Sequence, residues 1–187
     1  MHLDGNIESL QWNEAVSLRR PGLSACAGIG LMLRIRVFEA ADLEELRRIT
    51  VEGFDGIAID QNVERAIGIV GGHDWRWRKA RHVDEDVAAN PAGVFVAEID
   101  GRVAGYISTR IDREAGKGRI PNLAVDASER GAGIGRKLIE YALEYLRGEG
   151  MEFVMIETMA NNPIGQHLYP SCGFTEAGQQ IHYVRRL

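Results

Sequence analysis

The sequence predicts an α+β fold, in which a central mixed and mostly antiparallel sheet is flanked by helices. Two alternating segments on either side of Asp100-Gly101 predict a β-hairpin. A long amphipathic segment follows a glycine-rich turn that itself follows a short apolar strand. Strand and helix patterns then alternate to the end of the chain, so one sheet with helices packed on it is the expected architecture.

Composition fits one globular domain. The chain has 187 residues, of which 45% are hydrophobic and 26% charged, and its net charge is −5. The acidic balance disfavours general nucleic-acid binding, and no apolar run approaches the roughly 18 residues that a membrane span needs. Only two cysteines are present, so we expect no disulfide framework and a cytoplasmic protein. Nothing in the composition calls for a metal.

The domain is expected over residues 32–187. Residues 1–31 show no sustained period and carry scattered Gly, Pro and Ser, so we expect a disordered or loosely docked extension, or a start codon read upstream of Met32. Residues 33–38 alternate apolar and charged side chains, which predicts a half-buried strand. The next segment has leucine and isoleucine at helical spacing and ends at Gly53.

The second half of the chain predicts six more strands and two more helices in a clear order. Residues 93–111 form the hairpin, and residues 119–125 are a short apolar strand interrupted by Pro121. Residues 133–150 are the long amphipathic helix, and residues 152–158 are a buried strand. A short helix over 161–169 starts with Asn162 as N-cap and Pro163 at its first position. Residues 173–178 and 180–187 are expected to be two more strands, paired with each other.

A run of tryptophans and basic residues after Gly71-Gly72 has three interpretations. Aromatic and arginine side chains suggest a nucleic-acid surface, but four acids balance the four Lys and Arg of residues 74–87. An amphipathic helix capped by Asp74 explains the run better, with Trp77, Ala80, Val83 and Val87 on its buried face. The third interpretation is a lid over a bound acceptor.

The glycine-rich turn is the most informative stretch. A strand ends at Val125, and Arg130 to Gly135 then lead into a helix. Glycines let the backbone approach a ligand, and a helix N-terminus contributes about half a positive charge, so this arrangement favours an anion such as a phosphate. The glycine spacing fits neither the dinucleotide fingerprint G-x-G-x-x-G nor a P-loop. It reads R-x-x-G-x-G, with Arg130, Gly133 and Gly135.

This pattern resembles the pyrophosphate-binding turn of the GNAT superfamily, the N-acyltransferases that use acetyl-CoA. The preceding Leu123-Ala124-Val125 is similar to the family's splayed strand, and Asn162, Tyr169 and Gly173-Phe174 are similar to its second signature. The resemblance covers roughly residues 33–187. It implies an enzyme that transfers an acetyl group from acetyl-CoA to a primary amine of a small molecule or a protein by direct attack.

The resemblance also implies which residues act. Cofactor-binding residues would be Leu123, Ala124, Val125, Arg130, Gly131, Ala132, Gly133, Ile134, Gly135, Arg136, Asn162 and Tyr169. The backbone N–H near Leu123 would stabilise the oxyanion, and Tyr169 would protonate the leaving thiolate. Some relatives carry a glutamate base where this chain has Arg119, so Glu157, His73 or a water chain must replace it.

The acceptor remains open at this point. In the family, the region between the first strand and the hairpin chooses the acceptor, which here is roughly residues 52–90, and His73, Asp74 and Trp75 are the candidate substrate contacts. A tyrosine in the core and an asparagine that only caps a helix are the structural alternatives for Tyr169 and Asn162. A GNAT-type module that binds acyl-CoA without turnover is the alternative function, and a homodimer is compatible with either.

Overall fold

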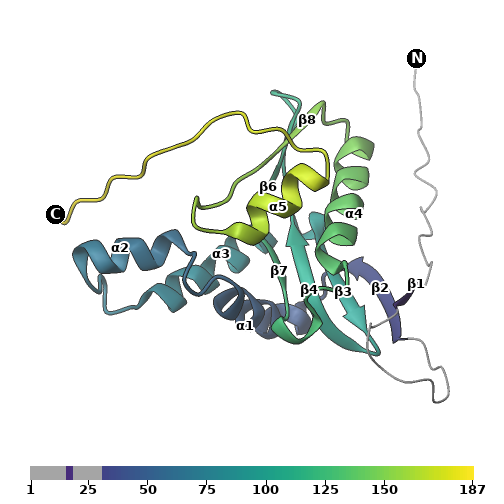
Figure 1. Ribbon diagram of the computed structural model, residues 1–187, viewed down its shortest axis with the longest axis horizontal. Coiled ribbons are helices and arrows are strands. Elements are labelled where there is room, and N and C mark those ends of the chain that lie inside the picture. The colour runs from purple at the N-terminus through teal and green to yellow at the C-terminus, as the bar shows by residue number, and fades with distance from the viewer. Residues whose placement is uncertain (1–15, 19–30) are drawn as a thin grey trace.

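The computed structural model describes residues 16–18 and 31–187, and the expected extension over 1–31 otherwise lies outside the described residues. The strands are β1 (Val16–Leu18), β2 (Leu31–Val37), β3 (Val94–Ile99), β4 (Arg102–Ser108), β5 (Arg110–Asp112), β6 (Lys117–Ile120), β7 (Leu123–Val125) and β8 (Phe153–Ile156). The helices are α1 (Leu43–Gly53), α2 (Ile59–Ile67), α3 (Trp75–Ala89), α4 (Ile134–Gly148) and α5 (Pro163–Ser171), with short 3-10 turns η1 (Ala40–Asp42), η2 (Pro91–Gly93) and η3 (Ala127–Glu129) (Figure 1).

The strands form two sheets instead of one continuous sheet. The larger has the order β1-β2-β3-β4-β7, and the smaller has the order β5-β6-β8. Every described pair is antiparallel except β6 with β8. The expected mostly antiparallel sheet is therefore confirmed, but it separates at Pro121, which cannot donate a ladder hydrogen bond. β6 pairs with β8 in the smaller sheet, and β7 pairs with β4 in the larger one.

Helices cover both faces of the larger sheet. On one face α4 packs Leu138, Ile139 and Leu146 against Phe95 and Ile107. On the other face, Leu46 and Ile49 of α1 and Val83 of α3 pack against Val94, Val96, Tyr106 and Ala124. Successive side chains of β3 point to opposite faces of the sheet and therefore pack into the two cores in turn. The result is a three-layer domain with α1 and α3 on one side and α4 on the other (Figure 1).

Two local predictions are confirmed by backbone geometry. Asp100 and Gly101 have φ values of 49° and 78°, as a type I′ turn between β3 and β4 needs. Asp74 caps α3 by accepting a hydrogen bond from the backbone N–H of Trp77 at 3.0 Å. The short helix α5 also starts as expected, but it runs through Pro170 to Ser171.

The buried face of α3 differs from the prediction. Trp75 is only 5% exposed, whereas Trp77 is 42% exposed and stacks on His73 with ring centroids 3.7 Å apart. The buried stripe runs through Trp75, Lys79, Val83 and Asp86, so two of its four members are charged. The sequence pattern predicted that the apolar face of α3 would be buried. The face that carries Lys79 and Asp86 is buried instead, because both charged side chains find hydrogen-bond partners in the interior.

The two C-terminal strands predicted over 173–178 and 180–187 are absent from the described structure. Residues 174–187 form an extended segment without strand pairing, and it runs from α5 toward α2 (Figure 1). A strand requires a neighbour that accepts its backbone hydrogen bonds, and this segment has none along its length. The predicted alternation is present in the sequence, but no described strand pairs with this segment.

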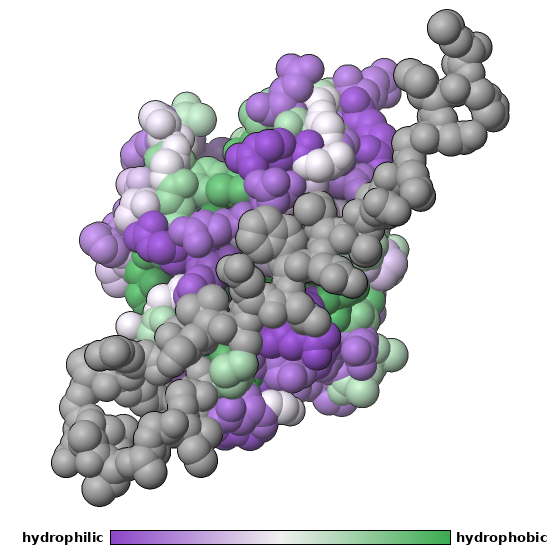
Figure 2. Space-filling view, turned by 90° about the vertical axis from the view of Figure 1, so that its right-hand side faces the viewer, coloured by the Kyte–Doolittle hydropathy of each residue, from purple (hydrophilic) through white to green (hydrophobic). Residues whose placement is uncertain are grey.

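The surface and the helices give two further observations. Hydrophilic and hydrophobic residues are interspersed on the face seen in Figure 2, apart from the atoms drawn in grey. Among the described residues, no helix has the length and the apolar character that crossing a membrane requires.

Candidate active site

Among the described strands, none pairs with one edge of β7, which is the last strand of the larger sheet. Its other edge pairs with β4, where Ala124 lies opposite Tyr106. The flanking residues confirm this register, because the Asn122 carbonyl accepts from Ser108 N–H and Asp126 N–H donates to the Ala104 carbonyl, both at 2.9 Å. Backbone groups alternate in direction along a strand, so the N–H and C=O of Leu123 and Val125 point to the unpaired edge.

The glycine turn follows this edge directly. Gly131 and Gly133 have φ values of 82° and 79°, and a Cβ added at either would meet no atom within 4 Å. Gly133 is the N-cap of α4. In the described part of the chain, no acceptor takes the backbone N–H groups of residues 131–136. The turn therefore presents a row of free donors at the positive end of a fifteen-residue helix.

Some residues of the R-x-x-G-x-G motif make contacts elsewhere and do not lie beside these free N–H groups. A Cβ on Gly135 would lie 3.3 Å from Leu168 Cδ2, so Gly135 is required for close packing against α5. Arg136 donates to the Ser171 carbonyl at 2.7 Å and to Ser171 Oγ at 2.8 Å, which fixes α4 to the end of α5. Arg130 folds back, and its Nε lies 3.3 Å from the Val125 carbonyl.

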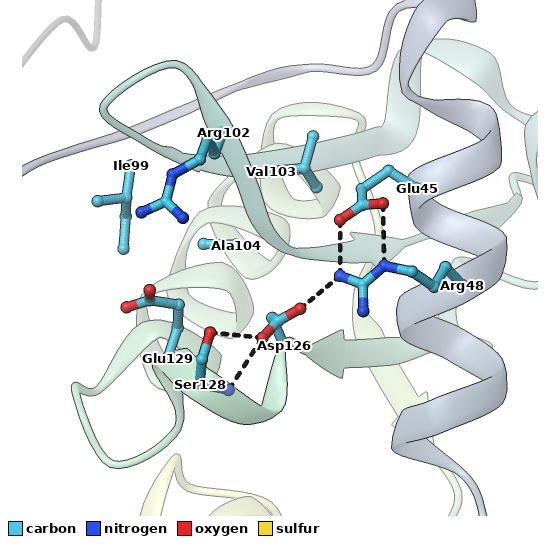
Figure 3. Close-up of a pocket in the computed structure, with 9 residues that line it drawn as sticks. All are labelled: Glu45, Arg48, Ile99, Arg102, Val103, Ala104, Asp126, Ser128 and Glu129. Carbon is cyan, nitrogen blue, oxygen red and sulfur yellow. Dashed lines mark hydrogen bonds and ion pairs between the residues drawn. The ribbon is translucent and has the colours of Figure 1, made fainter.

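A charged cluster fixes the chain between β7 and the turn. Asp126 accepts from Ser128 Oγ at 2.6 Å and from Ser128 N–H at 2.9 Å, and Arg48 of α1 donates to it at 2.5 Å (Figure 3). The Ser128 hydroxyl and then Arg48 lower the pKa of Asp126 to about 2. A cavity of about 300 Å³ lies beside the cluster, between α1, the β3–β4 hairpin and η3. None of the predicted site residues lines it.

Tyr169 of α5 is a partly buried phenol packed edge-on against Phe174 at 6.2 Å between ring centroids. Burial raises its pKa to about 12, so the hydroxyl is protonated at neutral pH. Its hydroxyl has no hydrogen-bond partner among the described residues. A neutral phenol with a free O–H can donate a proton or a hydrogen bond to a bound group.

Asn162 is the N-cap of α5. Its Oδ1 accepts from Gly165 N–H at 3.2 Å, and its Nδ2 donates to Thr158 Oγ1 at 2.9 Å. Capping alone is therefore sufficient to explain this residue. Beside it, Asn161 donates to the Gly56 carbonyl at 2.9 Å and ties the β8–α5 loop to the α1–α2 loop.

A buried polar network, which the sequence did not suggest, holds the start of β7. Asn122 Nδ2 and Ser108 Oγ each donate to Asp86 Oδ2 at 2.6 Å. Arg110 donates to Asp86 Oδ1 through Nε at 3.1 Å and Nη2 at 2.8 Å. Lys79 Nζ donates to Asn122 Oδ1 at 2.7 Å. The network links α3 to the point where β6 and β7 separate, so it fixes the position of the unpaired edge.

Lys79 is the unusual member of this network. The side chain is 6% exposed, and its ammonium lies 3.7 Å from the centre of the Phe54 ring. Burial lowers the pKa of Lys79 to about 8, against the opposing attraction of Asp60 and Asp86. Asp60 has a buried Oδ2 without a hydrogen-bond partner and lies 3.7 Å from His82 Nε2. These groups lie under the α1–α2 loop, on the side of the sheet away from α4.

The candidate bases and substrate contacts are not all brought together. Glu157 directly follows β8, whose Ile156 lies opposite Ile120 of β6, and it accepts from Arg119 at 2.5 Å. His73 lies at the turn between α2 and α3, at the far end of the helical layer from β7 (Figure 1). The side chain of Trp75 is buried, and its backbone N–H donates to Glu64 at 2.5 Å, so Trp75 is unavailable as a surface contact.

Known proteins share both the sequence pattern and the fold. The profile of the acetyltransferase (GNAT) family matches residues 43–174. A mycothiol acetyltransferase from Thermomonospora curvata is 36% identical over 94 residues, which is 50% of this chain and 31% of that protein. The chain thus spans about a third of the length of the curated relatives it matches.

Two solved structures show the same fold. The protein PH1933 from Pyrococcus horikoshii has a TM-score of 0.63 and 23% identity over 79% of this chain and 92% of its own. Aminoglycoside N-acetyltransferase AAC(6')-Iy, solved with CoA, has a TM-score of 0.62 and 20% identity over 87% of this chain and 100% of its own. Because the family profile covers well over half of its residues, this chain belongs to the GNAT acetyltransferase family.

Proposed function

We propose that the protein transfers an acetyl group from acetyl-CoA to a primary amine by direct attack. The observation that carries this proposal is the unpaired edge of β7 running into free N–H donors at the N-terminus of α4. An extended pantetheine arm fits a strand edge that offers alternating donors and acceptors. The pyrophosphate then falls at the turn, where backbone donors and the helix dipole favour negative charge.

Each group of the site has a part in this reaction. The nitrogen of the amine attacks the thioester carbonyl, and the N–H of Leu123 donates to the oxyanion. The intermediate collapses with cleavage of the C–S bond, and the thiolate takes the phenolic proton of Tyr169. A solvent proton restores the phenol, while the attacking nitrogen loses its proton to a base. The products are an acetylamide and the free thiol of CoA.

Glu157 is the better supported of the two side-chain bases. It is exposed directly after the end of β8, two residues beyond the exposed Met155. Its partner Arg119 holds the carboxylate in place while leaving one oxygen without a partner in the described residues. His73 lies farther off and is stacked on Trp77, so we assign it to acceptor selection or to no role in the chemistry.

The acceptor site is proposed on the side of the sheet that carries α1, α2 and α3. The Asn161–Gly56 hydrogen bond connects the α1–α2 loop to the β8–α5 loop across the gap. Asp74 caps α3 and Trp75 is buried, so these two act on the acceptor only through the position of α3. Amino sugars are the first acceptors to try, because one structural neighbour is an aminoglycoside N-acetyltransferase.

Thiol release from acetyl-CoA, measured with a panel of amino sugars, polyamines and peptides, tests the proposal. We expect CoA to bind in calorimetry and at least one amine to release thiol. CoA binding without turnover on any amine would favour the alternative, a regulatory module that binds acyl-CoA. Absence of CoA binding would contradict both. From the cysteine usage we place the reaction in the cytoplasm.

A further inference from the structure

The peptide group between Asn122 and Leu123 is held at its carbonyl oxygen. This oxygen accepts from the Ser108 N–H at 2.9 Å, and Ser108 Oγ lies 3.4 Å from it. The peptide is trans and planar, so its N–H points in the opposite direction, toward the edge of β7 with which no described strand pairs. The direction of the Leu123 N–H, the proposed oxyanion donor, is therefore set by whatever fixes Asn122.

Asn122 is fixed through each of its four polar atoms. Besides the carbonyl bond, its backbone N–H donates to Ser108 Oγ at 3.1 Å. Its side chain accepts from Lys79 Nζ at 2.7 Å and donates to Asp86 Oδ2 at 2.6 Å. Asn122 is only 3% exposed, so bulk water cannot replace these partners. A residue held in this way transmits the position of its partners to the peptide that it shares with Leu123.

Lys79 is the partner that stability alone does not explain. Moving an ammonium group out of water is costly, and the hydrogen bond to Asn122 offsets that cost only in part. A methionine of similar length would occupy the same interior space without this cost. A buried charge that weakens the fold, and that is bonded to the residue beside a proposed site, is a candidate for a role in function.

We propose that Lys79 is a positioning residue for acetyl transfer, which acts through Asn122 to aim the Leu123 N–H at the oxyanion of the thioester. This inference rests on the proposed acetyl transfer and adds a residue of α3 to it. A charged donor forms a stronger hydrogen bond than a neutral one, so protonated Lys79 holds the Asn122 amide most firmly. Accurate aim matters because an oxyanion donor acts only where it is preorganised toward the developing charge.

The charge of Lys79 changes in an experimentally useful range of pH. The charged and titratable groups around Lys79 and Asp86 come from α2, α3, β4 and β5, and they are Asp60, His82, Tyr106 and Arg110. Burial lowers the pKa of Lys79 to about 8 against the attraction of Asp60 and Asp86. Burial also lowers the pKa of His82 and raises that of Tyr106, so these two side chains stay uncharged while Lys79 loses its proton.

Steady-state kinetics of Lys79→Met from pH 7 to 9 tests the role in turnover. At pH 7 we expect kcat to fall about 10- to 100-fold while KM for acetyl-CoA stays nearly unchanged, because the donors of the glycine turn remain. The ratio of native to variant kcat should shrink above pH 8, because Lys79 then loses its charge while the amine titrates alike in both chains. Lys117→Met changes a far less buried lysine and should leave kcat unchanged.

Two kinetic outcomes would overturn the positioning role. Equal kcat in the native chain and in Lys79→Met would show that the ammonium does not support the reaction. A ratio that stays constant with pH, in a variant that circular dichroism shows to be folded, would make Lys79 a structural residue only. Lys79→Gln keeps an N–H donor without the charge, and it is measured in the same way if Lys79→Met does not fold.

The amide proton of Leu123 provides a test that needs no amine. In NMR spectra of the native chain, acetyl-CoA should move this resonance further downfield than CoA does, because only acetyl-CoA brings a carbonyl oxygen to the N–H. The additional shift should be smaller in Lys79→Met and unchanged in Lys117→Met. An equal shift in Lys79→Met would overturn the inference and leave the proposed transfer standing. No additional shift in the native chain would contradict Leu123 as the oxyanion donor, and the inference with it.

Discussion

Lys79 of α3 donates to Asn122 at 2.7 Å, and this bond joins the helical layer to the residue that precedes β7. Asn122 in turn donates to the fully buried Asp86. The pantetheine-binding edge proposed for β7 thus depends on side chains that are 36 and 43 residues away in the sequence. The network thereby fixes the start of the proposed binding edge.

Asn122→Ala should destabilise the fold by about 2–3 kcal/mol, because it leaves buried partners on Lys79 and Asp86 unsatisfied. Chemical denaturation measures this difference. Asn62→Ala is the matched control, since Asn62 accepts only a surface bond from Arg65 and its loss should cost no more than about 0.5 kcal/mol. Equal effects of the two substitutions would show that the network contributes no special stability.

Lys79 should make stability depend on pH. Its pKa falls from the ordinary 10.5 to about 8 in the folded chain, mainly through burial. Between these values the unfolded chain holds a proton that the folded chain has released, so stability rises with pH across this window by up to about 3 kcal/mol. Below pH 8 the full cost of the buried ammonium remains.

Denaturation of Lys79→Met across pH 7 to 10.5 checks this, because the rise should be missing relative to the native sequence. Lys117→Met removes a lysine that is far less buried and should preserve the rise. If Lys79→Met follows the same pH curve as the native chain, the ammonium is not desolvated as the structure indicates.

Gly133→Asp should abolish CoA binding. The new carboxylate would repel the pyrophosphate, and the positive φ of this position would strain the turn that presents the donors. Gly150→Asp is the matched control at the other end of α4, with a φ of 81° and equal free space. Calorimetric titration with CoA compares the two. Retained affinity in Gly133→Asp would move the cofactor away from the turn.

Glu157→Gln should lower kcat by about 10²- to 10⁴-fold if the carboxylate takes the proton of the amine. His73→Gln should leave kcat unchanged, because His73 lies at the distant α2–α3 turn. Steady-state kinetics at saturating acetyl-CoA measures both variants against the native chain. The reverse pattern would assign the proton to His73.

Features that local chemistry decides could be predicted from the sequence. Asp100-Gly101 needs positive φ, Asn162 and Asp74 cap helices, and Gly133 opens α4, and each of these follows from residue type and immediate neighbours. Pro121 similarly marks the break that separates β6 from β7.

Features that depend on distant partners could not be predicted from the sequence. The buried face of α3 includes Lys79 and Asp86, which are satisfied by residues of β4, β5 and the β6–β7 junction that no helical periodicity reveals. For the same reason Trp75 is buried and Trp77 is exposed, which is the reverse of the prediction. Residues 180–187 alternate as a strand does, but alternation does not specify a partner, and no described strand pairs with them.

Thiol release and CoA affinity, measured together in the native chain and in Tyr169→Phe, test the central claim most directly. The native chain should release thiol from acetyl-CoA in the presence of its amine. Tyr169→Phe should bind CoA with nearly unchanged affinity while its chemical step slows by about ten- to a thousandfold, as expected for a lost acid catalyst. An unchanged rate in Tyr169→Phe would remove the phenol from the mechanism, and a native chain that binds CoA but releases no thiol would contradict the proposed transfer.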